Sequence, residues 1–142
     1  MIMPVRASAF APCQRCACSA LRRASRAVTQ HFEASFRGTG LRATQFTLLA
    51  RLIQTGPLPI GALAGRLGLE RTTLTRNLQL LEKKGLVAVA GDEDQRVRRI
   101  AVTRKGEVAA AAALPAWKRA QASADDVLRR SGVGMLPGAQ PG

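Results

Sequence analysis

A row of polar side chains without an acid recurs at helical spacing between residues 71 and 84. In a helix over this segment, Leu74, Leu78 and Leu81 share one face, and the polar row lies on the opposite face. Hydroxyl, amide and guanidinium groups hydrogen-bond the edges of bases, and lysine contacts phosphates. The pattern is therefore typical of a helix that lies in the major groove of DNA. The candidate DNA contacts are Arg71, Thr72, Thr73, Thr75, Arg76, Gln79 and Lys83.

The alternative is an ordinary amphipathic helix whose polar face only contacts water. Such faces normally mix side chains of both charge signs, and the acidic residue Glu82 lies off the polar row. The row of a single charge sign therefore favours a polyanionic partner.

A predicted β-hairpin with arginines beside its tip follows this helix. Two short strands, over residues 86–90 and 97–102, are joined by a polar turn. Arg96, Arg98 and Arg99 lie on or beside the tip. An arginine in a narrow minor groove adds affinity with little sequence readout, so Arg96 and Arg98 are predicted DNA contacts. A solubilising polar turn is the alternative for the hairpin taken alone.

Three cysteines, Cys13, Cys16 and Cys18, lie together at the start of the first predicted helix. A thiolate near a helix N-terminus and near arginines has a lowered pKa, which favours oxidation to a sulfenate and then to a disulfide. Structural or incidental thiols are the alternative. The thiols and His31 would also suit a thiophilic metal, but there is no second clear ligand pair. We therefore expect no metal and no cofactor, and a structural role for His31.

The sequence offers little catalytic equipment. It has one histidine and nine acids, and it lacks the HExxH, GxSxG and Walker motifs. We therefore expect that the protein is not an enzyme. A thiol redox activity through Cys13 and Cys16 is the enzymatic alternative.

Charge and composition narrow the class of partner and the compartment. The 142 residues suit one domain, and 22 basic against 9 acidic residues give a net charge of +13. Such an excess indicates a nucleic acid or an anionic membrane surface as partner. No stretch reaches the ~18 apolar residues that span a membrane, and no apolar leader core precedes Cys13. We expect a cytoplasmic protein without a membrane partner, because an odd number of cysteines also argues against a secreted disulfide framework.

Helical periodicity surrounds the candidate interface on both sides. The predicted helices span residues 16–36, 45–55, 59–68, 71–84 and 103–130. Thr44 and Thr103 are the predicted N-caps of the second and last helices, and Pro115 predicts a kink in the last one. Residues 1–14 are predicted to be a flexible arm and residues 131–142 a disordered tail.

The order helix, turn, helix, hairpin predicts a mainly α fold, the winged helix-turn-helix with a small β-hairpin wing. Over residues 18–121 the sequence resembles the MarR family of bacterial regulators. The resemblance is carried by LRRASRAVTQ (21–30), GLRATQFTLL (40–49), LAxxL (63–67), RTTLTRNL (71–78), LEKKGLV (81–87), DQR (94–96), VTxxG (102–106) and LPAW (114–117).

The resemblance implies a homodimer that binds short palindromic operators on double-stranded DNA and usually represses. It assigns residues 41–102 to DNA binding, and residues 15–37 and 103–130 to N- and C-terminal dimerisation helices. A small ligand or an oxidised cysteine is expected to release the DNA. Family members usually have a further C-terminal helix, in place of which we expect the tail over residues 131–142.

The resemblance also singles out Cys18 as a possible redox sensor. Cys18 matches the reactive cysteine of the hydroperoxide-sensing branch by its spacing to Leu21 and Ser25. That branch holds its cysteine with tyrosines, whereas this chain has none and carries Arg22 and Phe32 there.

A sequence-tolerant, nucleoid-associated DNA-binding protein is the alternative function. The charge of +13 would suit it. The hydroxyl and amide groups of Thr72, Thr75 and Gln79 favour the operator-specific regulator, because these groups contact base edges.

Overall fold

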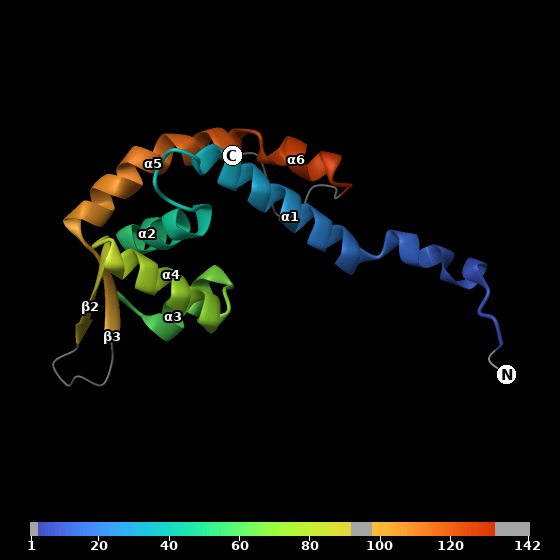
Figure 1. The fold of residues 1–142 in the computed structure, drawn as a ribbon, viewed down its shortest axis with the longest axis horizontal. Helices are drawn as coiled ribbons and strands as arrows, with labels where there is room; N and C mark the ends of the chain where they lie inside the picture. Colours follow the sequence, from blue (N-terminus) through green and yellow to red (C-terminus); the bar gives the residue numbers. More distant parts are fainter. Residues whose placement is uncertain (1–2, 92–97, 133–142) are drawn as a thin grey trace.

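The computed structural model describes residues 3–91 and 98–132 of the chain. It is mainly helical with one small antiparallel sheet, which confirms the predicted winged helix-turn-helix (Figure 1). The elements in order are the 3-10 helix η1 (Ala7–Arg15), α1 (Ala17–Phe36), α2 (Ala43–Thr55), β1 (Leu58–Pro59), α3 (Ile60–Leu67), α4 (Arg71–Lys83), β2 (Val87–Gly91), β3 (Arg98–Val102), α5 (Arg104–Ala122) and α6 (Ala124–Arg130).

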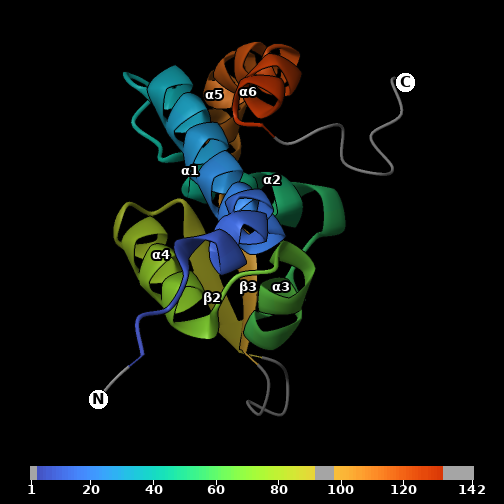
Figure 2. The ribbon, with the colours of Figure 1, turned by 90° about the vertical axis from the view of Figure 1, so that its right-hand side faces the viewer.

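Helix α2 lies between two groups of elements. On one side α1 packs along α5 and α6, and on the other side α3, α4 and the sheet pack together (Figures 1 and 2). The core joins both groups through side chains with at most 1 % exposure, namely Leu48, Leu49, Leu63, Leu74, Leu81 and Ile100. Burial of these branched side chains, each worth about 1.5–3 kcal/mol, fixes the helix-turn-helix against the sheet.

The sheet has the order β1-β3-β2, and both pairings are antiparallel. The predicted hairpin of β2 and β3 is confirmed, with Val89 opposite Ile100. Strand β1 was not predicted, because it has two residues and one of them is Pro59. Proline has no N–H to donate, so it fits at the edge of a sheet. Through β1, the segment between α2 and α3 is tied to the hairpin.

The start of α2 corrects the predicted N-cap. The helix begins at Ala43 instead of after Thr44, and no side-chain cap comes from the residue before it. Instead, Gln45 Oε1 accepts a hydrogen bond of 3.1 Å from the Arg42 N–H, and Glu33 Oε1 accepts one of 3.0 Å from the Ala43 N–H. Two side-chain oxygens from inside and outside the helix thus satisfy its free N–H groups.

The last predicted helix is in fact two helices. Helix α5 continues through Pro115 and ends at Ala122. Ser123 interrupts the helix, and α6 begins at the next residue. Pro115 is tolerated because it costs one backbone bond on an exposed face of α5. Helix α6 turns so that Val127 packs its side chain inward on the α1 side (8 % exposed). The expectation that residues 103–130 form one helix was wrong, and the tail expected after them lies outside the described residues beyond Gly132.

The N-terminal segment projects away from the other elements (Figure 1). Residues 1–14 were predicted to be a flexible arm, and most of the described part forms η1, which has no buried side chain. Flexibility of this arm stays a prediction, and so does disorder of the tail, which lies outside the described residues beyond Gly132. Within residues 3–91 and 98–132, no helix combines the length and the apolar character needed to cross a membrane.

Candidate nucleic-acid interface

Helix α4 presents the predicted polar row to solvent. Leu74, Leu78 and Leu81 are at most 5 % exposed and anchor one face of the helix in the core. Opposite them, every predicted contact of this helix is exposed: Arg71, Thr72, Thr73, Thr75, Arg76, Gln79 and Lys83. Gly85 has a φ of 73°, a left-handed conformation that favours glycine, and the helix ends before it. The structure therefore gives these side chains the accessibility that contact with DNA requires.

The middle of this row is hollowed. Arg71, Thr72, Thr75, Arg76 and Gln79 line an open hollow of about 460 Å³. A base edge that enters this hollow would meet both hydrogen-bond donors and short hydroxyl side chains.

Two polar side chains of α4 are turned back onto their own helix. Thr75 Oγ1 donates a hydrogen bond of 2.8 Å to the Arg71 carbonyl, and Asn77 Nδ2 donates one of 3.0 Å to the Thr73 carbonyl. Such local bonds compete with outside partners for the side-chain donors. The donors that α4 leaves for a partner therefore come mainly from its arginines, lysine and glutamine.

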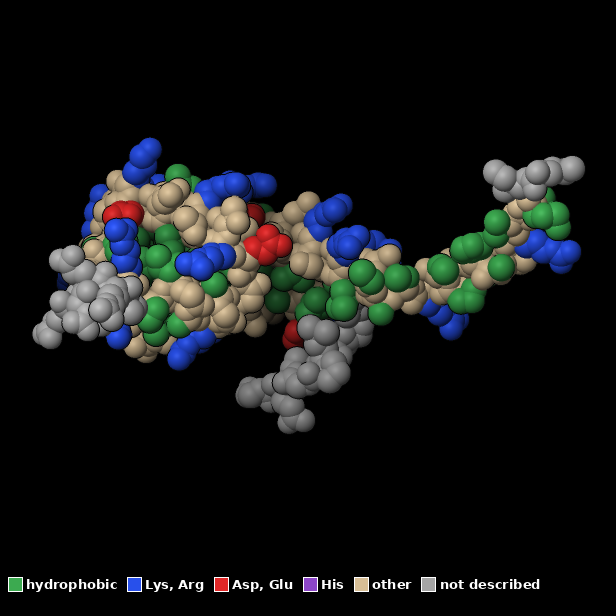
Figure 3. Space-filling view, turned by 90° about the horizontal axis from the view of Figure 1, so that it is seen from below, with side chains coloured by type: hydrophobic (Ala, Val, Ile, Leu, Met, Phe, Trp, Pro, Cys, Tyr) green, Lys and Arg blue, Asp and Glu red, His purple; other side chains and the backbone are tan. Residues whose placement is uncertain are grey.

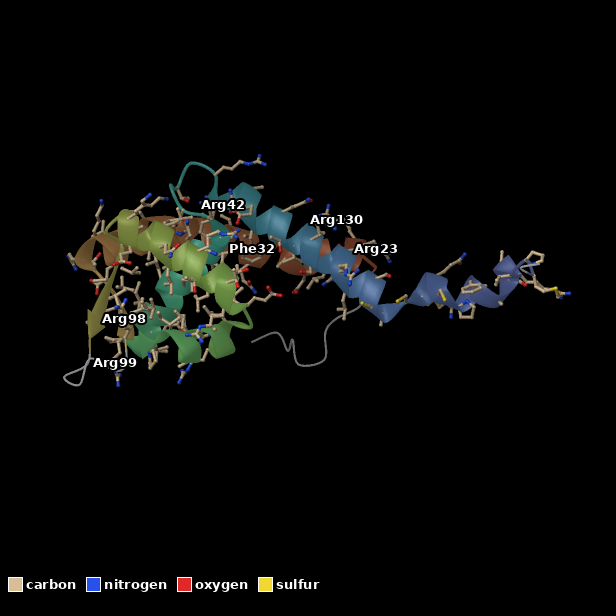
Figure 4. All side chains as sticks on the ribbon, turned by 60° about the horizontal axis from the view of Figure 1, so that its bottom comes forward. Arg23, Phe32, Arg42, Arg98, Arg99 and Arg130 are labelled. Carbon is tan, nitrogen blue, oxygen red and sulfur yellow. The ribbon has the colours of Figure 1, made fainter. Side chains whose placement is uncertain are left out.

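The base of the wing adds cations on both faces of β3. Ile100 is buried, and successive side chains of a strand point to opposite faces. Arg98 therefore shares the face of Ile100, and Arg99 lies on the other face; both are exposed (Figure 4). Arg96, the other predicted wing contact, lies outside the described residues. Arg99 was not among the predicted contacts, although the alternation of the strand would have placed it on the outer face.

The cations of α4 and β3 are not neutralised by ion pairs within the described ranges. The three ion pairs found there lie elsewhere: Arg42–Glu33 at 3.6 Å, Arg104–Glu107 at 3.4 Å and Arg129–Asp126 at 3.8 Å. Seen from below, basic side chains are spread over the molecule and acidic ones are sparse (Figure 3). This surface would attract a polyanion.

The cysteines occupy three different positions around the start of α1. Cys16 is the residue before the first turn of α1, whereas Cys13 lies in η1 and Cys18 is exposed on α1 itself. Hydrogen bonds from the backbone and hydroxyl of Ser19 lower the pKa of the Cys16 thiol, with smaller help from the Cys18 backbone and Arg23, against an opposing effect of burial. The resemblance singled out Cys18, and the hydrogen bonds from Ser19 make Cys16 a second candidate for the reactive thiol. In the described part of the chain, no cluster of histidine, cysteine and acidic side chains is arranged to hold a metal ion.

An apolar groove that the sequence did not predict runs between α2 and α5. It measures about 430 Å³, and its lining includes Phe46, Ala50, Ile53, Ala110 and Leu114. Trp117 lines an adjoining depression that shares Phe46 and Leu114 with it. The groove lies between the helix-turn-helix side of the molecule and the α1–α5 side.

The fold and this surface define a winged helix-turn-helix protein in which α4, the second helix of the helix-turn-helix, has an exposed, cationic face. The model of the MarR family matches residues 41–97. The transcriptional regulator MosR of M. tuberculosis, solved in complex with DNA, is 40% identical, with 86% of each chain covered and a TM-score of 0.70. A probable transcriptional regulator from Pseudomonas aeruginosa is 30% identical, with 73% of this chain and 78% of that chain covered and a TM-score of 0.64.

BpsR of Bordetella bronchiseptica shares the fold, with a TM-score of 0.73, 95% of this chain and 88% of that chain covered, and 20% identity. No curated protein matches the sequence. The family model and the two closer likenesses establish that the chain belongs to the MarR family.

Proposed function

We propose that this protein is a sequence-specific DNA-binding transcriptional regulator, a repressor that binds a palindromic operator as a homodimer. The observation that carries the proposal is the exposed row of cationic, hydroxyl and amide side chains on α4, with Glu82 as its one acidic neighbour on that helix, together with the cationic base of the wing. In support, structures of the similar proteins MosR and AbfR have been solved in complex with DNA. We also propose that the protein has no catalytic activity and that it acts in the cytoplasm, where its DNA target lies.

A dimer would place two copies of α4 in successive major grooves. Such an arrangement requires half-sites about one helical turn, or 10–10.5 base pairs, apart. The dimerisation surface we propose is formed by α1, α5 and α6. Leu21 on α1 and Leu114 on α5 are 50% and 40% exposed, so both helices have apolar side chains that a second copy would cover.

The groove between α2 and α5 is our candidate site for a small apolar effector. A ligand that prefers a dimer whose two α4 helices are spaced incorrectly for DNA must weaken DNA binding. By linkage, it does so by the same factor by which DNA weakens binding of the ligand. BpsR offers a parallel, since its DNA binding is regulated by 6-hydroxynicotinic acid. Trp117 is the single tryptophan and adjoins the groove. A bound effector is therefore expected to change tryptophan fluorescence, at the concentrations that release DNA.

Thiol oxidation is the second proposed route of release. A hydroperoxide would oxidise the thiolate of Cys16 or Cys18 to a sulfenic acid and leave as the alcohol, and a second thiol would then displace water to form a disulfide. The structure of AbfR has been solved in reduced and overoxidised forms on DNA. Cys18 stays a candidate for the oxidised thiol because of its spacing to Leu21 and Ser25. The lowered pKa of the Cys16 thiol favours Cys16 for the same role.

The test is selection of duplexes from a random library, followed by binding measurements on selected and scrambled duplexes at one stated salt concentration. A specific regulator is expected to prefer its selected site by at least about a thousandfold. Equal affinity for both duplexes would contradict the proposal and favour the sequence-tolerant alternative, which the charge of +13 would explain.

A further inference from the structure

We infer that Thr75 contacts the C5 methyl group of a thymine in the major groove, and that its own methyl group makes this contact. This inference rests on the DNA binding proposed for α4. It adds a specificity-determining residue, because it states which chemical group of the base Thr75 distinguishes.

The hydroxyl of Thr75 is already engaged. It donates to the Arg71 carbonyl at 2.8 Å, and a hydroxyl has one hydrogen to donate. The bond turns Oγ1 back along the helix, so the methyl group takes one of the other two staggered positions at Cβ. Thr75 is exposed, at the edge of the polar face of α4 next to the buried Leu78. The hydroxyl oxygen can still accept a hydrogen bond, but its hydrogen is used, and the methyl group is the part of Thr75 that can make an apolar contact.

The shape around Thr75 fits a small apolar projection. Thr75 lines the open hollow of about 460 Å³ together with the longer side chains of Arg71, Arg76 and Gln79. In the major groove, thymine is distinguished from the other bases by a methyl group that projects from the base edge. A methyl group that enters the hollow would meet the methyl group of Thr75 and lose its contact with water.

The neighbouring side chains complete the recognition. Arg76 and Gln79 offer donors for a purine next to the thymine. Asn77 is half-buried, and its amide donates one hydrogen bond to the Thr73 carbonyl at 3.0 Å, which orients the side chain back along α4. We therefore expect each half-site to contain a thymine whose methyl group contributes to affinity, beside a purine that Arg76 contacts.

The experiment uses the full chain and the best duplex selected from a random library. Each thymine is replaced in turn by deoxyuridine, which lacks only the methyl group, and the Kd is measured. Two variants separate the groups of the side chain: Thr75→Val keeps the methyl group, and Thr75→Ser keeps the hydroxyl. The matched control is Thr55→Ser on α2, because the exposed Thr55 hydroxyl also donates to a carbonyl of its own helix, that of Arg51 at 3.0 Å. Thermal unfolding verifies that all variants fold.

For the wild type, we expect deoxyuridine at one thymine of each half-site to weaken binding about fourfold, which is the effect of one buried methyl group. Thr75→Val should keep this sensitivity. Thr75→Ser should bind the unmodified duplex about fourfold more weakly and lose the sensitivity at that position, and Thr55→Ser should behave as the wild type.

The inference is overturned if no deoxyuridine weakens binding, if Thr75→Ser keeps the sensitivity, or if Thr75→Val loses as much affinity as Thr75→Ser. In each of these cases a selected site still exists, so the proposed function stands. If the library yields no preferred sequence, both the inference and the proposed function are overturned.

Discussion

The imidazole of His31 on α1 lies 2.9 Å, from Nε2 to Oγ, from Ser123, the residue that separates α5 from α6. The same nitrogen lies 3.0 Å from the carbonyl oxygen of Ala120. With its hydrogen on Nε2, the ring donates to both oxygens, and the Ala120 carbonyl, which already accepts from the Ser123 N–H at 3.3 Å, gains a second donor. His31 therefore fastens α1 to the point at which the last helix changes direction, a structural role as the sequence led us to expect.

Replacement of His31 is expected to loosen the last helix. His31→Ala should lower the free energy of unfolding by about 0.5–1.5 kcal/mol, because it removes the hydrogen bonds between α1 and the junction of α5 and α6. Urea unfolding at a fixed protein concentration measures the loss. Thr29→Ala, at an exposed position of α1, is the control and should have little effect. If both variants unfold alike, the contact of His31 with Ser123 does not stabilise α6.

Gly106 is expected to tolerate no side chain. An added Cβ would collide with the carbonyl oxygen of Leu86 and meet Val102 Cγ1 at 2.8 Å, where α5 passes the sheet. Gly106→Ala should therefore lower the free energy of unfolding by about 1–3 kcal/mol. Gly65→Ala on α3 is the matched control, because a Cβ there meets nothing within 4 Å. In that helix interior alanine should stabilise by about 0.5–1 kcal/mol, and a loss of similar size in both variants would refute the close approach.

The two kinds of cation should affect DNA binding differently. Arg98→Ala and Arg99→Ala should each reduce the slope of log K against log salt by about 0.9, if each contacts one phosphate, and leave the preferred sequence unchanged. Arg76→Ala should cost about 1–3 kcal/mol and relax the preference at one or two base pairs. Binding titrations at four salt concentrations measure the slopes. Lys118→Ala, on an exposed part of α5, is the control. An unchanged slope for both wing variants would remove them from the interface.

Cys16 should react as a thiolate at a lower pH than an ordinary cysteine. Its pKa is lowered by hydrogen bonds from Ser19, so the thiolate population rises at a lower pH in the folded chain than in the unfolded one. In the double variant Cys13→Ser, Cys18→Ser, the pH profile of iodoacetamide alkylation measures this shift. Identical profiles for the folded chain and the chain in urea would contradict it.

The same thiol is expected to control oxidative release. Hydroperoxide should release DNA from the wild type, and Cys16→Ser should retain DNA after the same treatment. If Cys18→Ser retains DNA and Cys16→Ser does not, the sequence-based choice of Cys18 was the better one.

Local patterns in the sequence predicted most of the fold. The leucines of α4 and Gly85 after it placed that helix within a residue, because helix periodicity and a left-handed glycine are local properties. Exposure of the polar row also followed, since the opposite face is apolar. Strand β1 was missed because a strand of two residues is too short to show the alternation of polar and apolar side chains.

The remaining differences depend on contacts between distant residues. The start of α2 is set in part by Glu33, ten positions before Ala43. The break at Ser123 coincides with contacts to His31, 92 positions earlier in the chain. The hydrogen bonds that Cys16 accepts from Ser19 depend on the place at which η1 ends and α1 begins. None of these relationships can be predicted from the spacing of residue types along a short stretch of sequence.

A single residue, Thr103, joins the end of β3 to the start of α5. Its hydroxyl donates to the Gly85 carbonyl at 2.6 Å and accepts from the Gly106 N–H at 3.1 Å, so the joint has little freedom to bend. We therefore expect a tilt of α5 to carry the hairpin with it. A molecule bound beside Leu114 that tilts α5 would then change the position of the wing arginines without contacting the surface proposed to face DNA.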